Sequence, residues 1–357
     1  MPTDSGVYEG SPVSDAVASA RAQRAEDSTP TFTGDKSSWE GKSVVSVSQF
    51  SAEALGLLFE VCERMKEMVA DKTDGATLSC RPPLRGHVLG TLFYENSTRT
   101  SCSFQTAMLR LGGSFVSVDA SSSSIKKGET LEDTVMCLLS YCDAIALRHP
   151  AKGAARAAVG VARRPVLNAG DGVGEHPTQA LLDLYTVAAE LGGGAGLSGL
   201  QGKVVAMVGD LKHGRTVHSL SRLLGKFGCV LRYVSPVSLR MPQYIQKQGE
   251  AAGVPTTQTE EEDLSLVLQE ADVLYVTRIQ RERFVSPEEF DAVNGYYRVT
   301  PETLSKAKAS AVLMHPMPRV GEVAEDCDLD PRAAYFKQME NGMFVRMALL
   351  ALIFGKA

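Results

Sequence analysis

The sequence of 357 residues contains no apolar run close to the roughly 18 residues that are needed to span a bilayer. The N-terminus lacks the apolar core of a secretory signal, and its acidic residues argue against an organelle transit peptide. Basic residues are in deficit, with 37 Lys and Arg against 42 Asp and Glu, a net charge of −5 and a pI near 5.8. Nucleic acid and anionic membranes therefore have no electrostatic footprint here. An anionic ligand would have to be held by local positive charge.

Paired cysteines are also missing. The seven cysteines are scattered and include no Cys-x-x-Cys, which indicates free thiols in a reducing compartment and predicts a cytoplasmic protein. His213 and His218 lie five positions apart beside Arg215, a spacing that does not put both on one helical face. We therefore expect no structural zinc. The overall composition, with 44% hydrophobic and 22% charged residues, is ordinary for a globular chain long enough for two domains.

The organisation along the chain is that of an α/β protein. Residues 1–40 are rich in Ser, Thr, Asp, Gly and Ala without apolar periodicity, and we expect a flexible N-terminal segment with no packed core. Short apolar strands then alternate with helices in two series, which predicts two doubly wound parallel-sheet domains. The glycine-rich stretch 191–202 indicates a boundary. The predicted domains are 41–190, with the C-terminal helix 333–357 returning to it, and 191–332.

The apolar patterns predict individual elements. The C-terminal helix is apolar on much of its surface and is expected to pack between other elements. Predicted strands cover residues 88–94, 114–118, 144–147, 166–169, 203–208, 230–234, 273–277 and 311–314. Predicted helices cover residues 51–68, 131–141, 216–227, 264–269 and 334–354, with two more that follow residues 97–100 and begin at 177 or 178.

The most informative segment is residues 93–113. A buried strand leads into the turn Ser97-Thr98-Arg99-Thr100, and a helical pattern follows with Phe104, Met108 and Leu111. The first turn of a helix has unpaired N–H groups and the positive end of the helix dipole. Hydroxyls and a planar guanidinium at that point favour a phosphate site. The alternative is an ordinary amphipathic helix with Ser and Thr as caps.

Polar residues gather where the predicted strands end. In open α/β sheets, ligands bind outside the carboxyl ends of the strands. Arginines recur within a few residues of these ends, which suits a ligand with several anionic groups, although any single one is more often a solvated loop cation. The segments concerned are residues 97–100, 148–150, 209–215, 278–280 and 315–319.

Two further segments allow both a functional and a structural interpretation. His176 precedes Pro177 at a predicted helix start, and it is either a ligand to a small polar group, with Gln179, or an N-cap beside an N1 proline. The run 315–318, His-Pro-Met-Pro, must form a stiff turn. This turn either presents backbone carbonyls to an amino group of a ligand or is a purely structural turn of the kind that can contain a cis proline. The loop 209–215 follows a strand but lacks G-x-G-x-x-G, so we expect no dinucleotide cofactor.

Taken together, these motifs resemble the aspartate transcarbamoylase family, in particular the transcarbamoylase domain of the animal and fungal multifunctional pyrimidine proteins. The resemblance implies the transcarbamoylase fold, with its domains linked by two interdomain helices. It also implies transfer of a carbamoyl group from carbamoyl phosphate to L-aspartate, the committed step of pyrimidine synthesis, without metal or cofactor. The matching segments are residues 93–100, 126–130, 170–186, 209–220, 277–284, 315–320 and 330–350.

The resemblance also implies a role for each matching residue. The phosphate would be bound by Ser97, Thr98, Arg99 and Thr100. The carbamoyl group would be surrounded by Arg148, His176, Gln179, Met317 and Pro318. The two carboxylates of aspartate would be held by Arg215, Thr216, Arg278 and Gln280. In this family a loop equivalent to the one with Ser123 and Lys127 reaches a neighbouring subunit's site, which implies a homotrimer with shared sites.

The chemistry that the resemblance implies needs no side-chain nucleophile. The amine of aspartate attacks the carbamoyl carbon and phosphate leaves, while Thr100, Arg148 and His176 stabilise the carbonyl oxygen and Arg99 with Lys127 the leaving group. Ornithine transcarbamoylase is the nearest rival. Arg278 and Gln280 favour a second carboxylate, and its usual His-Cys-Leu-Pro run is His-Pro-Met-Pro here. A catalytically silent scaffold subunit is the other alternative, but such proteins usually lose a ligand residue.

Overall fold

The computed structural model describes residue 8 and residues 13–70, 82–119, 123–192, 196–251, 256–259 and 264–357. The chain forms two compact units: unit 1 is Met1–Gln179 with Gly342–Ala357, and unit 2 is Ala180–Asn341. Both divisions fall inside helices, α6 (Pro177–Gly192) and α12 (Tyr335–Ile353), so each of these helices runs from one unit into the other. The sequence-based boundaries, after residues 190 and 332, lie near the end of α6 and just before α12.

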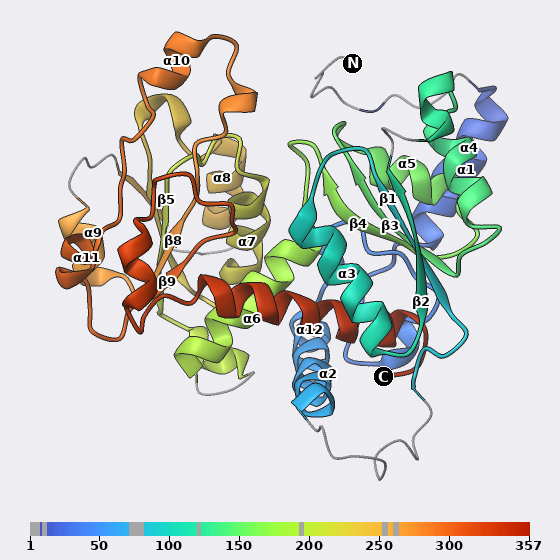
Figure 1. Ribbon diagram of the computed structural model, residues 1–357, viewed down its shortest axis with the longest axis horizontal. Helices are drawn as coiled ribbons and strands as arrows, with labels where there is room; N and C mark the ends of the chain where they lie inside the picture. The colour runs from blue at the N-terminus through green and yellow to red at the C-terminus, as the bar shows by residue number, and fades with distance from the viewer. Residues whose placement is uncertain are drawn as a thin grey trace. The chain divides into compact units, whose positions relative to one another are not determined.

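Unit 1 is built on a four-stranded parallel sheet with the order β2-β1-β3-β4, as Figure 1 shows. Strands β1, β3 and β4 are almost entirely buried, as is usual for parallel sheets, which helices cover on both faces. The strands are β1 (Val88–Phe93), β2 (Ser114–Asp119), β3 (Ala144–His149) and β4 (Val166–Asp171). All four were predicted to within two residues at each end.

The helices of unit 1 follow the strands in alternation. Residues of α4, α5 and β3 share one hydrophobic cluster, which includes Leu131, Val135, Leu147 and Ala158. The α-helices that begin in unit 1 before α6 are α1 (Asp15–Asp27), α2 (Ala52–Ala70), α3 (Thr98–Arg110), α4 (Leu131–Leu138) and α5 (Ala154–Val161). The short 3-10 helix η5 (Ser124–Lys127) precedes α4.

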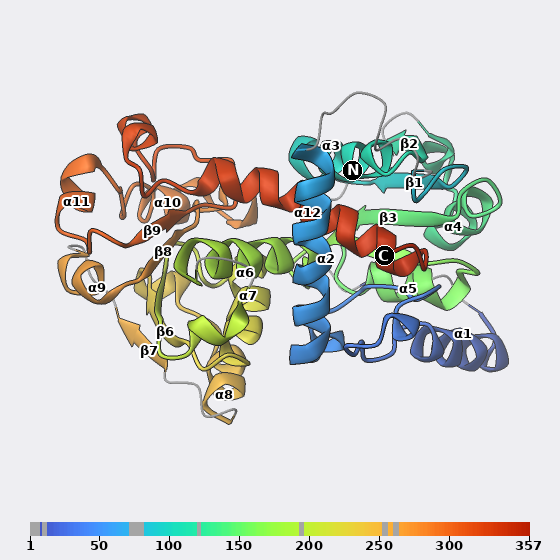
Figure 2. The ribbon, with the colours of Figure 1, turned by 90° about the horizontal axis from the view of Figure 1, so that it is seen from below.

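The expectation that residues 1–40 form a flexible segment without a packed core was wrong for residues 13–40. Helix α1 lies beside α5 (Figure 2), and Ala25 joins the core cluster of this unit. Farther along, Phe32 and Trp39 are fully buried and stack with ring centroids 4.4 Å apart. The composition misled because α1 buries a small alanine in place of a row of large apolar side chains.

Unit 2 holds a five-stranded parallel sheet with the order β7-β6-β5-β8-β9. The strands are β5 (Val204–Val208), β6 (Val230–Val234), β7 (Thr256–Thr259), β8 (Val273–Val276) and β9 (Val312–Met314). Strand β7 was not predicted. It lies at the edge of the sheet and reads Thr-Thr-Gln-Thr, so it has no apolar run for a pattern to detect.

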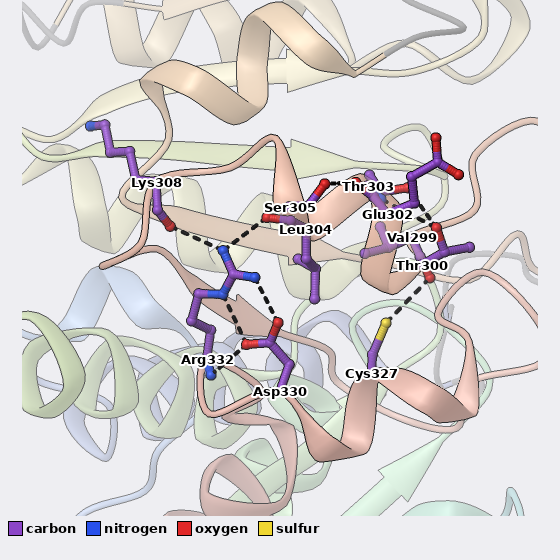
Figure 3. Close-up of polar contacts among 10 residues, drawn as sticks. All are labelled: Val299, Thr300, Glu302, Thr303, Leu304, Ser305, Lys308, Cys327, Asp330 and Arg332. Carbon is purple, nitrogen blue, oxygen red and sulfur yellow. Dashed lines mark hydrogen bonds and ion pairs between the residues drawn. The ribbon is translucent and has the colours of Figure 1, made fainter.

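The α-helices of unit 2 between α6 and α12 are α7 (Arg215–Gly225), α8 (Gln243–Ala251), α9 (Ser265–Glu270), α10 (Pro287–Asp291) and α11 (Pro301–Ser305). The chain that leads into α12 is fixed by Arg332, which donates to the carbonyls of Leu304 at 2.8 Å and Lys308 at 3.2 Å (Figure 3). Asp330 binds the same guanidinium at 2.6 Å. This network anchors the segment after β9 to the end of α11.

Candidate active site

The predicted phosphate turn lies at the carboxyl end of β1 and the start of α3. Ser97 is the N-cap residue, but its side chain accepts no capping hydrogen bond, which argues against the ordinary cap interpretation. Thr100 is buried at 6% exposure, whereas Thr98 and Arg99 are exposed. The first turn of this helix of 13 residues therefore presents backbone N–H groups, hydroxyls and a guanidinium together, as anion binding requires.

Arg148 lies beside that turn, because it is the β3 residue that pairs with Phe93 at the end of β1. Its Nε lies 3.3 Å from Glu95 Oε2, and its Nη1 donates to the carbonyl of Ala169 at 3.3 Å. The backbone carbonyl of Arg148 accepts from Tyr94 N at 2.9 Å. The guanidinium is thus held from β1 and β4, and the sheet register brings it next to the Ser97–Thr100 turn.

The loop after β4 holds His176 in place. Asp171 accepts from Glu175 N at 2.6 Å and from Gly153 N at 3.0 Å, so one carboxylate ties this loop to the start of α5. At Gly172, with φ of +58°, an added Cβ would lie 2.0 Å from the carbonyl oxygen of Pro150, so only glycine fits there. Packing this tight leaves the end of the loop little freedom.

Glu175 links the same loop to the segment before α2. Its carboxylate accepts from Ser46 Oγ at 2.7 Å and from Val47 N at 2.9 Å. Next to it, His176 and Gln179 are buried at 4% and 8% exposure at the start of α6. The structure therefore places these two predicted residues on the first turn of a helix that begins where β4 ends.

Arg346 is a residue of this half that the sequence reasoning missed. It lies on α12, is 3% exposed, and donates to Ser103 Oγ on α3 at 3.0 Å and to Thr178 Oγ1 on α6 at 3.1 Å. Its guanidinium also stands 5.0 Å from the centroid of the Phe104 ring. The signal was available, since Arg346 is the one charged residue between Glu340 and Lys356. It joins the two helix starts that carry Arg99 and His176.

Ser123 and Lys127 lie at the two ends of the segment that contains η5. Lys127 is exposed and has no ion-pair partner among the residues that the structure describes. Gly128, with φ of +93°, ends the 3-10 turn, and Thr130 then caps α4 by accepting from Asp133 N at 3.1 Å.

In unit 2, a buried carboxylate organises the loops after β5 and β8. Asp210 is fully buried, and it accepts from His213 N at 3.0 Å and from Gln280 N at 3.4 Å. These two loops carry the predicted carboxylate ligands: Arg215 and Thr216 begin α7, and Arg278 and Gln280 follow β8. Arg215 and Arg278 therefore both follow strands at the carboxyl edge of the second sheet.

The His-Pro-Met-Pro run forms the predicted stiff turn after β9. The Met317–Pro318 bond is cis, and Met317 has φ of 53°. His315 is 1% exposed; its Nδ1 accepts from Met317 N at 2.8 Å, and its Nε2 lies 2.6 Å from Glu322 Oε1. Because Nδ1 accepts, Nε2 carries the proton and donates to Glu322. Although burial by itself raises the pKa of Glu322, the hydrogen bond from His315 lowers it below its ordinary value.

This turn is also tied to both helices that leave the unit. His315 N donates to Gln338 Oε1 on α12 at 3.0 Å, and Gln338 Nε2 donates to Asp183 Oδ1 on α6 at 2.6 Å. Tyr275 of β8 donates to the other oxygen of Asp183 at 2.7 Å. The backbone of Met317 and Pro318 is therefore set by a continuous buried network.

The described residues also bear on whether the chain could span a membrane or bind a metal ion. No described helix combines the length and apolar character of a membrane span. Within the same ranges, no three His, Cys, Asp or Glu side chains are grouped as metal ligands would be. The described cysteines, Cys62, Cys102, Cys137, Cys142, Cys229 and Cys327, are free thiols.

Two parallel-sheet units, each with arginines and helix starts at the carboxyl edge of its sheet, define an α/β protein whose strand ends are suited to small anionic ligands. The model of the carbamoyl-phosphate-binding domain of aspartate/ornithine carbamoyltransferases matches residues 42–189, and that of the aspartate/ornithine-binding domain matches residues 201–353. The chain therefore belongs to the aspartate/ornithine carbamoyltransferase family.

Individual relatives narrow the resemblance. The chain is 50% identical over 340 residues to the multifunctional protein pyr1-3 of Dictyostelium discoideum, covering 95% of this chain but 15% of that protein. It is 46% identical over 319 residues to the aspartate carbamoyltransferase catalytic subunit of Thermoplasma volcanium, covering 88% of this chain and 99% of that subunit.

Among solved structures, aspartate transcarbamoylase of Trypanosoma cruzi with N-(phosphonacetyl)-L-aspartic acid has a TM-score of 0.79 at 40% identity, covering 91% of this chain and 97% of that one. The carbamoyl phosphate complex of the same enzyme has a TM-score of 0.80 at 38% identity, covering 92% and 99%. The resemblance to aspartate transcarbamoylase and the transcarbamoylase fold are thereby confirmed.

Proposed function

We propose that the chain transfers the carbamoyl group of carbamoyl phosphate to L-aspartate, giving N-carbamoyl-L-aspartate and phosphate. The observation that favours L-aspartate as the second substrate is the position of Asp210. Its carboxylate binds the loop that leads to Arg215 and the loop with Arg278 and Gln280 at one edge of the sheet. Two cationic loops suit a substrate with two carboxylates, whereas ornithine has one. This reaction is the committed step of pyrimidine synthesis.

The half-site of unit 1 is proposed to bind carbamoyl phosphate. The phosphate would accept from the α3 N-terminus and from Ser97, Thr98, Arg99 and Thr100. The carbamoyl oxygen would accept from Thr100, Arg148 and His176, while the carbonyls near Gln179 hold the amino group. Burial of Thr100 and His176 supports this assignment, because fixed donors away from water stabilise developing charge without reorganising.

The half-site of unit 2 is proposed to bind L-aspartate through Arg215, Thr216, Arg278 and Gln280. The Met317 and Pro318 backbone would accept from the carbamoyl amino group. The amine of aspartate then forms the new C–N bond, the C–O bond to phosphate breaks, and the departing phosphate takes the amine proton. Positioning of both reactants and fixed donors supply the catalysis in this scheme.

The test is a product assay with purified chain, saturating carbamoyl phosphate and either L-aspartate or L-ornithine. We expect carbamoyl aspartate alone, and we expect Arg278→Ala to raise the KM for aspartate far more than that for carbamoyl phosphate. Citrulline would contradict the assignment of unit 2. No product from either amine would favour a scaffold subunit.

We also propose a homotrimer in which Ser123 and Lys127 complete a neighbouring subunit's site, because the exposed Lys127 has no ion-pair partner in the described part of its own chain. Light scattering measures the oligomeric state. Mixing Lys127→Ala with Arg99→Ala chains should restore part of the activity in hybrid trimers, and no recovery despite confirmed mixing would contradict sharing.

A cytoplasmic location is proposed as well, and imaging of the tagged chain tests it.

A further inference from the structure

Glu132 is a buried carboxylate whose hydrogen-bond and ion-pair contacts reach into the N-terminal segment. It lies in the first turn of α4 and is 3% exposed. Tyr8 Oη donates to its Oε2 at 2.7 Å, and Arg21 Nη1 lies 3.7 Å from its Oε1. Both contacting residues precede residue 42, where the family match begins. An ionised carboxylate at this depth is costly unless it is paired.

Tyr8 also contacts the strand end that carries Arg148. Its ring meets the ring of His149 edge-on at 5.5 Å, and its N–H donates to the carbonyl of Lys152 at 2.7 Å. A second tyrosine, Tyr94, packs against the same imidazole at 4.6 Å. Burial and the hydrogen bond to Glu132 raise the pKa of Tyr8, so the phenol stays protonated and acts as the donor.

Helix α1, which carries Arg21, packs closely against the backbone of α5. At Gly160 of α5, an added Cβ would stand 3.0 Å from the carbonyl oxygen of Arg21, so α1 approaches α5 at its glycine. Ala25 of α1 joins the same core cluster as Ala158 of α5. This contact between small residues fixes the position of Arg21 relative to Glu132.

The first turn of α4 is continuous with the segment of Lys127. Thr134 Oγ1 of α4 donates to Glu129 Oε2 at 2.9 Å, which holds the residues between Lys127 and the helix against it. Ile125, inside η5, packs on the same hydrophobic cluster as Tyr8. Displacement of the Glu132 turn would therefore displace Lys127 as well.

We propose that Tyr8 and Arg21 are positioning residues that hold Glu132, and through it the start of α4 and the Ser123–Lys127 segment. The N-terminal segment would thus contribute to carbamoyl phosphate binding without touching the substrate. This inference rests on the proposed function for the role of Lys127. Its physical basis is that loss of these two contacts leaves a carboxylate that is 3% exposed less well compensated, and greater exposure of it to water would require the first turn of α4 to move.

The primary experiment combines Tyr8→Phe with Arg21→Gln, which keeps the aromatic ring and most of the long side chain. We expect the KM for carbamoyl phosphate to rise by about three- to tenfold, the effect of losing one part-buried hydrogen bond and one ion pair. The KM for aspartate should change by less than about twofold, because a local displacement acts on nearby ligands. Arg24→Gln is the matched control on α1, since Arg24 donates to the carbonyl of Val161.

A double-mutant cycle separates positioning from general stability. In a Glu132→Ala background no carboxylate needs partners, so the Tyr8 and Arg21 substitutions should add little further change in KM. Additive effects would mean that the two residues do not act through Glu132 and would overturn the inference. Thermal unfolding midpoints of all variants show whether each remains folded at the assay temperature.

A second readout does not depend on activity. Trypsin cleavage after Lys126 or Lys127, followed by mass spectrometry, should be about three to ten times faster in the double variant, because exposure follows local opening. Cleavage after Arg110 within α3 is the internal control. Unchanged cleavage and unchanged KM would refute positioning. Faster cleavage in a chain whose unmodified form makes no carbamoyl aspartate would refute the proposed function and leave the positioning intact.

Discussion

Arg148 Nε lies 3.3 Å from Glu95 Oε2, with 15% and 25% of the two side chains exposed. The pair joins the end of β3 to the turn after β1, the two segments that we propose to hold the carbamoyl oxygen and the phosphate. It orients a guanidinium that would otherwise sample several rotamers. A partly buried pair with a fixed partner geometry matters more for position than for net stability.

The first prediction concerns this pair. Arg148→Ala should lower kcat by about 10²- to 10³-fold, as loss of an oxyanion donor does. Glu95→Ala should lower kcat by about tenfold, because Arg148 remains but loses its ion-pair partner. Steady-state kinetics with both substrates measure this, and Glu95→Gln is the isosteric control. A Glu95→Ala enzyme with normal constants would show that the pair does not orient Arg148.

A second prediction tests the bridge made by Arg346 between α3 and α6. Arg346→Met keeps the bulk but removes the donors to Ser103 and Thr178. The thermal midpoint should fall by about 2–8 °C, from a loss of about 1–3 kcal/mol. Arg346→Lys should restore only part of the lost thermal midpoint, because an ammonium group lacks the planar fork with which arginine reaches both hydroxyls. Full rescue by lysine would contradict the bidentate explanation.

The third prediction concerns Asp210. Asp210→Ala would leave the part-buried backbone amides of His213 and Gln280 without their acceptor. We expect the KM for aspartate to rise by about 10- to 100-fold, equivalent to about 1–3 kcal/mol. Binding of carbamoyl phosphate alone, measured by calorimetry, should be unchanged. Asp210→Asn retains an acceptor oxygen and should lose less; equal losses would point to the charge itself.

The fourth prediction is a pH dependence of stability. Burial lowers the pKa of both His149 and His218 to about 4, from an ordinary value of 6.5. The unfolded chain therefore takes up protons below pH 6.5 that the folded chain does not accept until about pH 4. Stability should be greatest above pH 6.5 and should fall as the pH drops through that window.

Variants at the two histidines test the pH prediction. His149→Asn keeps an acceptor for Ala151 N, and His218→Gln keeps a donor for the carbonyl of Leu211. Each should flatten the fall in the thermal midpoint between pH 6.5 and about 4. An unchanged slope in both variants would show that other groups, such as the paired carboxylates, govern acid unfolding.

Some of the fold could be read directly from local pattern. Buried parallel strands such as β1 and β6 are short apolar runs between polar turns, and their bounds agree with the structure to within a residue. The helix that follows Ser97 was equally clear from its apolar spacing. Local pattern failed at α1, where Ala25 is the one buried residue, and at the polar edge strand β7.

The candidate site likewise contains residues that local sequence indicated and residues that only the packing of distant elements revealed. For residues adjacent in sequence, such as Ser97 to Thr100, the turn and helix start could be predicted because turn chemistry is local, while their binding of phosphate stays a prediction. Arg346 was missed because its partners Ser103 and Thr178 are far away in the sequence, and only helix packing reveals what a lone arginine in an apolar helix contacts. The assignment of Lys127 to a neighbouring subunit's site stays a prediction.

By itself, the sequence determined most of the apolar strands, the longer helices, the parallel α/β class and the family, since all of these depend on local pattern and motif. Tertiary structure decided which distant groups meet: Glu95 with Arg148, Asp210 with two loops, and Tyr8 with Glu132. The reason is physical. Hydrogen bonds and ion pairs act over a few ångströms, and only the folded chain brings residues far apart in sequence within that range.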